Sequence, residues 1–167
     1  MKKIISFLVG LILFVLIPIL GWGISDIDGF IMNPFRLAFV IMMAIFSILV
    51  VIFVPNEGRG YGDGDNKKII KRQKLTILTL QIMPILIIFL SPYFERHQVL
   101  TISENNTIQF IGLVLVFIGF SLMNWSIMVL GKQFSINVTI QENHKLITNG
   151  PYKLIRHPRY LGIMLFL

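Results

Sequence analysis

The chain has 167 residues, of which 55% are hydrophobic and 14% charged, and its mean hydropathy of +0.79 exceeds what one water-soluble core requires; the composition predicts an all-α, polytopic membrane protein. The net charge of +7 comes from Lys and Arg at the edges of apolar runs, which favours anionic lipids over nucleic acid as partners. The chain has no Cys and three scattered His residues, so disulfides are excluded and no metal site is expected.

Four uncharged runs approach or exceed the length of about 20 residues that a helix needs to cross a bilayer. They predict four complete transmembrane helices at residues 4–24, 37–54, 75–93 and 108–130. The first run follows Lys2 and Lys3 and is longer than the apolar core of a signal peptide, which favours an anchored helix. A last apolar run, residues 161–167, is expected to be the start of a fifth transmembrane helix in which the chain stops.

Two of these runs contain residues that predict how their helices pack. The third run contains Pro84, near which a kink is expected. The fourth run carries small and polar residues that suit close packing between helices, namely Gly112, Gly119, Ser121, Asn124 and Ser126. Its second half is therefore expected to face protein.

The basic residues indicate which way the helices cross the membrane. Lys and Arg are concentrated in the N-terminus and in residues 55–74 and 131–160, whereas the two other loops contain only Arg36 and Arg96. Cytoplasmic loops carry the excess of basic residues. We therefore expect a bacterial inner (cytoplasmic) membrane protein whose N-terminus and residues 131–160 face the cytoplasm.

Residues 131–160 differ from the rest of the chain because hydrophobicity falls and functional groups crowd together. The pattern is His144-x-Leu-Ile-x-x-Gly150-Pro-Tyr-x-x-x-Arg156-His-Pro-x-Tyr160-x-Gly162. It resembles the signature of the isoprenylcysteine carboxyl methyltransferase family and its relatives among the phospholipid methyltransferases. The resemblance is carried by this spacing as a whole and covers only residues 144–162, because the upstream helices match only in being membrane-spanning.

The resemblance implies an S-adenosylmethionine-dependent methyltransferase whose cofactor-binding segment is residues 131–160. The acceptor that it implies first is the carboxylate of an isoprenylcysteine-like or other lipid-like acid, entering from the bilayer. Carried over residue by residue, the implied cofactor contacts are His144, Lys145, Leu146, Ile147, Tyr152, His157, Pro158, Arg159 and Tyr160, with Thr139 at a position where the match is looser.

The residue types suit such a cofactor. An aromatic face at Tyr152 or Tyr160 attracts the sulfonium cation without offering a nucleophile, and His157 can donate a hydrogen bond to a ribose hydroxyl or a carboxylate. Methyl transfer to an ionised carboxylate needs no proton donor or acceptor, so no acid or base is assigned, and His157 and Tyr160 are expected to position the reactants.

Simpler interpretations stay open beside this one. Arg156 and Arg159 also suit interfacial anchors, and Tyr152 and Tyr160 suit the aromatic belt of a membrane protein. Alternative functions are N-methylation of a phospholipid amine, a sterol-reductase-like enzyme that uses NADPH, and a non-catalytic membrane scaffold. The family continues with an Arg and paired Glu residues, whereas this chain has no acidic residue after Glu142. The 167-residue chain alone is therefore expected to bind cofactor weakly and to be inactive.

Overall fold

The computed structural model describes residues 2–54, 71–99, 105–131 and 147–167, and every regular element within these ranges is helical. The elements are α1 (Lys2–Leu11), η1 (Ile12–Leu16), α2 (Ile17–Trp22), η2 (Ile24–Asp26), α3 (Ile27–Met32), α4 (Pro34–Phe53), α5 (Lys71–Arg96), α6 (Asn106–Leu130), η5 (Gly150–Lys153) and α7 (Pro158–Phe166).

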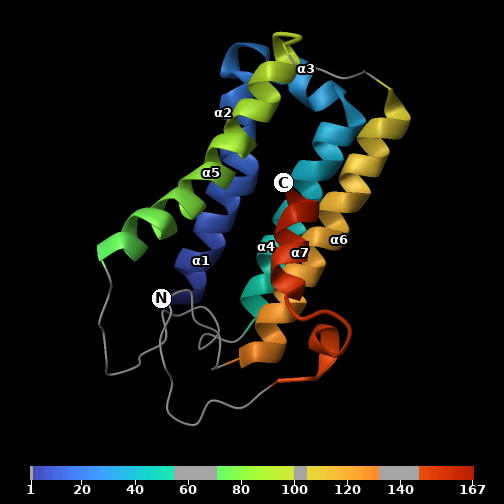
Figure 1. Cartoon of the computed structure of the whole chain (residues 1–167). Helices are drawn as coiled ribbons and strands as arrows, with labels where there is room; N and C mark the ends of the chain where they lie inside the picture. Colours follow the sequence, from blue (N-terminus) through green and yellow to red (C-terminus); the bar gives the residue numbers. More distant parts are fainter. Residues whose placement is uncertain (1, 55–70, 100–104, 132–146) are drawn as a thin grey trace.

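The long helices run up and down a bundle (Figure 1). The N-terminus, the start of α5, the end of α6 and η5 lie at the lower end of Figure 1, and α3 lies at the upper end with the end of α5. The short helix α7 turns back from the lower end and lies beside α6, so that the chain ends halfway up the bundle. The segment with the methyltransferase-like motif is thus at the same end as the N-terminus.

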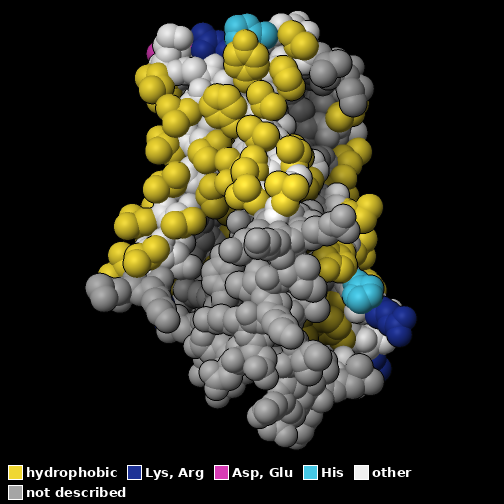
Figure 2. Space-filling model, turned by 60° about the vertical axis from the view of Figure 1, so that its left-hand side comes forward, with side chains coloured by type: hydrophobic (Ala, Val, Ile, Leu, Met, Phe, Trp, Pro, Cys, Tyr) yellow, Lys and Arg dark blue, Asp and Glu magenta, His cyan; other side chains and the backbone are white. Residues whose placement is uncertain are grey.

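Three helices of the described residues are long and apolar enough to cross a membrane, namely Lys3–Trp22, Pro34–Phe53 and Asn106–Leu130. Hydrophobic side chains cover the middle of the face shown in Figure 2, with basic and His side chains at its two ends. By the hydropathy of its helices the chain is a multi-pass membrane protein. Helix α5 contains the predicted third span, residues 75–93, but it is not among these three helices, and the nine-residue α7 is short for a span.

The helix ends differ from the predicted ones where local hydrogen bonds decide them. The first helix ends at Trp22, not at residue 24, because Gly23 has a φ of 103° that breaks the helix. Helix α4 begins at Pro34, not at residue 37, because Asn33 accepts hydrogen bonds from the backbone N–H groups of Phe35 and Arg36 at 2.9 and 3.2 Å. Between them lies the short helix α3, which the sequence did not predict.

The first helix contains a π-helical turn, η1 (Ile12–Leu16). The backbone N–H of Ile17 donates to the carbonyl of Ile12, five residues back. Two residues after this turn's end comes Pro18, which has no N–H and whose ring clashes with the carbonyl four residues earlier in a regular helix. The wider turn accommodates the proline without ending the helix.

Helices α6 and α7 approach each other so closely that their backbones touch at two glycines. A Cβ atom at Gly119 would lie 2.6 Å from the carbonyl oxygen of Gly162, and a Cβ at Gly162 would lie 2.7 Å from that of Gly119. The predicted packing role thus holds at Gly119, whereas a Cβ at Gly112 would meet no atom within 4 Å. The crossing of α6 and α7 requires glycine on both helices.

Aromatic rings from four elements meet above this crossing. The ring of Phe120 on α6 lies 5.6 Å from Phe14, 4.9 Å from Phe46 and 5.8 Å from Phe166, measured between ring centroids. Phe120 is only 5% exposed. Tilted and edge-to-face aromatic pairs are favourable beyond the area that they bury. This cluster joins η1, α4, α6 and α7 at the centre of the bundle.

We predict that Gly119→Ala destabilises the protein by about 1–3 kcal/mol, because the added methyl group overlaps the backbone of α7. Gly112→Ala on the same helix is the matched control, since its methyl group meets open space and Ala favours the helix by up to about 1 kcal/mol. Thermal unfolding in detergent, followed by circular dichroism, measures both. Equal effects of the two substitutions would show that the close crossing does not contribute to stability.

Candidate functional site

The predicted site segment folds against the lower end of α6. Its first turn, η5, begins at Gly150, whose φ of 57° favours glycine. A Cβ there would lie 2.9 Å from Cγ2 of Val129 on α6, so the turn sits directly on that helix. The next residue, Pro151, is buried. A Gly-Pro pair is therefore required here by the close contact with α6 and by the turn.

The His-Pro pair of the motif starts α7. His157 has a non-helical backbone (φ −132°, ψ 64°), and its carbonyl accepts the first helical hydrogen bond, from Leu161 N–H at 3.3 Å. Pro158 occupies the first helical position, which suits its fixed φ and its missing N–H, and it is less than 2% exposed. The buried proline fixes the direction in which α7 leaves the surface and leaves His157 exposed.

Tyr152 is the residue of η5 that reaches α6. Its phenol forms a hydrogen bond with Ser126, whose own hydroxyl donates to the carbonyl of Leu122 at 2.7 Å. Burial raises the pKa of Tyr152 above its ordinary value of 10.0, and the charge of Arg159 and the hydrogen bond with Ser126 oppose this only in part. The phenol is therefore neutral throughout the physiological pH range.

Arg159 lies between the two tyrosines of the motif. Burial lowers the pKa of its guanidinium, while Tyr160 and Tyr152 act in the opposite direction. Arginine nevertheless stays protonated in proteins, so Arg159 is a half-buried cation. The structure thus brings Tyr152, Arg159 and Tyr160 together.

His157 and Tyr160 form the exposed part of the same site. Their rings lie 5.7 Å apart at an angle of 46°, and Tyr160 is 63% exposed. Five of the predicted site residues, Tyr152, His157, Pro158, Arg159 and Tyr160, are therefore placed by one short stretch of chain on the end of α6. Ile147 is half-buried just before η5, whereas Thr139, His144, Lys145 and Leu146 lie outside the described residues.

The arrangement combines aromatic faces, a cation and an imidazole. Tyrosine faces attract cations, and the guanidinium of Arg159 pairs with carboxylates or phosphates. The sequence contains no acidic residue after Glu142. Residues 147–160 therefore suit a ligand that carries both a positive centre and an acidic group.

Sequence reasoning assigned Ser126 only to helix packing. The structure adds that Ser126 is fully buried and bonded to Tyr152 across the interface between α6 and η5. A Ser one turn before the end of an apolar helix is the only sequence signal for this contact, and it does not identify the partner.

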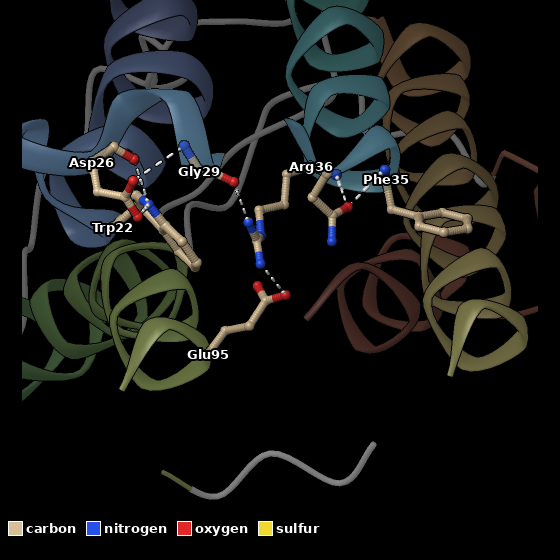
Figure 3. A network of polar contacts seen from close by, with 7 residues as sticks. Trp22, Asp26, Gly29, Phe35, Arg36 and Glu95 are labelled. Atoms are coloured by element: carbon tan, nitrogen blue, oxygen red, sulfur yellow. Dashed lines mark hydrogen bonds and ion pairs between the residues drawn. The ribbon is translucent and has the colours of Figure 1, made fainter. Parts of the chain in front are cut away.

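A second polar cluster, at the upper end of the bundle, was also not predicted. Figure 3 shows Arg36 and Glu95 reaching toward each other from α4 and α5. Arg36 donates to Glu95 at 3.0 Å and to the carbonyl of Gly29 at 2.9 Å, and its guanidinium carbon lies 3.8 Å from the centre of the Trp22 ring. Such a stacked, paired arginine links α4 to α2, α3 and α5.

Arg96, the other basic residue of this end, holds the turn after α2. Its Nη1 donates to the carbonyl of Trp22 at 2.5 Å and its Nη2 to the hydroxyl of Ser25 at 3.2 Å. The indole N–H of Trp22 in turn donates to the carbonyl of Asp26 at 2.8 Å. The two arginines thus donate hydrogen bonds to backbone carbonyl groups at a chain reversal, where the regular hydrogen bonds of the helices have ended.

We predict that Tyr152→Phe reduces the loss of stability at alkaline pH. Because the pKa of Tyr152 is raised in the folded state, the folded protein holds this proton more tightly than the unfolded chain does. The protonated phenol therefore contributes to the free energy of unfolding below pH 10, and this contribution is lost as the pH rises above 10. Unfolding in detergent between pH 8 and 11 measures this, with Tyr93→Phe at the upper end as control. The same alkaline slope in wild type and Tyr152→Phe would contradict it.

Comparison with known proteins agrees with the motif. Residues 111–167 match the model of the isoprenylcysteine carboxyl methyltransferase family. The chain is 34% identical over 67 residues to a probable protein-S-isoprenylcysteine O-methyltransferase of Oryza sativa subsp. japonica. These 67 residues are 39% of this chain and 35% of that protein. It is 35% identical over 57 residues to protein-S-isoprenylcysteine O-methyltransferase B of Arabidopsis thaliana, covering 33% of this chain and 29% of that protein.

The chain thus spans about a third of the length of the curated relatives that it matches. No solved structure matches it. The matched residues hold most of α6 together with η5 and α7, which are the elements that build the site. Residues 111–167 are therefore similar to the isoprenylcysteine carboxyl methyltransferase family.

Proposed function

We propose that this chain takes part in the transfer of a methyl group from S-adenosylmethionine to the carboxylate of a membrane-embedded, isoprenylcysteine-like acid. The proposal rests on one observation: the motif residues of the family segment, Tyr152, His157, Arg159 and Tyr160, gather on a single surface at the end of α6. The curated relatives, which are named as methyltransferases of this substrate class, support the choice of acceptor.

The residues of this surface fit the parts of the donor. S-adenosylmethionine carries a sulfonium cation, a carboxylate, a ribose and an adenine. In this proposal Arg159 pairs with the carboxylate, Tyr160 offers its exposed ring face to the sulfonium, and His157 donates to a ribose hydroxyl. Ile147 would enclose the adenine, together with the predicted contacts outside the described residues, Thr139, His144, Lys145 and Leu146.

The work of the chain in this reaction is binding and alignment. When bound, the donor supplies a methyl group on a positively charged sulfur. The acceptor carboxylate is already ionised, so the chain needs no residue that moves a proton, and alignment of two reactants contributes up to about 7–11 kcal/mol. The raised pKa of Tyr152 keeps its phenol neutral, so that it does not compete as an anionic nucleophile for the methyl group.

In the membrane, we propose that the lower end of Figure 1 faces the cytoplasm of a bacterial cell. The N-terminus and the end of α6 lie at this end, and the sequence carries clusters of Lys and Arg next to them along the chain, which also suits anionic lipids. Helix α5 is then the third of four spans and α7 starts a fifth. The acceptor would reach the site laterally from the bilayer.

Binding is tested by ultraviolet crosslinking of radiolabelled S-adenosylmethionine to the purified chain, which registers weak as well as strong binding. Tyr160→Ala should weaken labelling about 2- to 30-fold, because a cation–π contact contributes about 0.5–2 kcal/mol. Tyr160→Phe keeps the ring and should label like wild type. Met164→Ala, one turn further along α7 and 78% exposed, is the matched control. Equal labelling of Tyr160→Ala and wild type would overturn the assignment.

Turnover is tested with N-acetyl-S-farnesylcysteine as acceptor and a tritiated methyl donor. Carboxyl methylation gives a label that base releases as methanol, because esters hydrolyse and methylated amines do not. A base-stable label in the lipid fraction would instead identify amine methylation.

A further inference from the structure

The described part of the bundle contains a cavity of about 380 Å³ at the upper end, away from the site at Tyr152. It lies between the first turns of α4 and α6, the last turns of α5 and the end of α7. Its upper part is lined by polar side chains, chiefly Arg36, Glu95 and Gln109, and its deeper part by apolar ones such as Phe39, Leu113 and Val116. The cavity is therefore amphipathic along the bundle axis.

The charges at the polar end form a balanced pair. Arg36 and Glu95 lie 3.0 Å apart, and their side chains are 18% and 36% exposed. The Nε of Arg36 is buried and has no hydrogen-bond partner among the described residues. Arg36 also lines the cavity, and the fork of N–H groups on a guanidinium suits the oxygens of a phosphate that enters there.

We propose that this cavity binds a zwitterionic membrane phospholipid, one whose head group carries a phosphate and an ammonium. The phosphate meets Arg36, the ammonium meets Glu95, and part of one acyl chain fills the apolar depth. A purely anionic head would face Glu95 and a purely cationic head would face Arg36, so the pair selects a head with both charges. This site is separate from the methyltransferase surface and does not depend on its function.

The size of the cavity agrees with this occupant. Ligand cavities commonly measure about 300–1,000 Å³, and this cavity measures about 380 Å³. That space accommodates a segment of one acyl chain and not two whole chains. The rest of the lipid would remain in the bilayer against the exposed apolar side chains of the helices.

Trp22 provides a direct reporter, because its ring stacks against Arg36. The chain has two Trp residues, so Trp125→Phe leaves Trp22 as the single fluorophore. This protein, in maltoside detergent, is titrated with lysophosphatidylethanolamine and with lysophosphatidylglycerol. We expect a saturable change in Trp22 emission with the ethanolamine lipid at a concentration at least ten-fold lower than with the glycerol lipid. Equal responses to both lipids would overturn the proposal.

Two variants test the cavity itself. Gly112 lines it and has open space where a side chain would begin, so Gly112→Leu should fill the apolar part and weaken binding at least ten-fold without disturbing the fold. Leu115→Phe adds volume to an exposed position of α6 outside the cavity and is the matched control. Unchanged affinity in Gly112→Leu would show that the lipid binds elsewhere.

The charge argument has its own variant. Glu95→Gln removes the anion of the pair and keeps the size of the side chain, so the preference should shift toward the anionic glycerol lipid by about ten-fold. An unchanged preference in Glu95→Gln would contradict selection by the Arg36–Glu95 pair even if a lipid binds.

Discussion

The contact between the α6 and α7 backbones at Gly119 and Gly162 determines where the rest of the C-terminal segment lies. Because neither residue has a Cβ, α7 can lie against α6, and its direction is then fixed by buried Pro158 at its start. The same contact brings Phe166 into the aromatic cluster around Phe120. The site and the core of the bundle are therefore positioned by one helix pair, which is also most of the segment that the family model matches.

Much of the helical framework follows from the sequence, because long apolar runs are a local signal. The runs predicted at 37–54 and 108–130 lie in α4 and α6 within three residues at each end. The differences arise where single residues decide the ends: Gly23 stops the first helix, and Asn33 caps α4 early. The six-residue helix α3 was missed because it depends on a cap by Asp26 and on packing against α4, not on a periodic pattern.

The site could be predicted only in part. The motif spacing named Tyr152, His157, Arg159 and Tyr160, and the fold brings them together because all four lie within nine residues of one another. The contact of Tyr152 with Ser126 joins two elements across a long connection, and that of Arg36 with Glu95 joins residues 59 positions apart. No local pattern specifies such pairs. Counting basic residues in each loop identified Arg36 and Arg96 only as exceptions to the charge bias. In the structure, the guanidinium of Arg36 stacks on the Trp22 ring, and Arg96 donates to the Trp22 carbonyl in the turn after α2.

The π-helical turn at Ile12–Leu16 gives the first helix two different neighbours. In a regular helix Gly10 and Gly21, eleven residues apart, share one face, because eleven steps of about 100° return almost to the start. The extra residue in the wide turn swings Gly21 by about a quarter of a rotation. Gly10 accordingly meets Ser47 on α4 while Gly21 lies against the Phe89 carbonyl on α5. The number of residues between Gly10 and Gly21 therefore determines which helix each glycine contacts. Deleting one residue between them would change these contacts, whereas most side-chain replacements there would not.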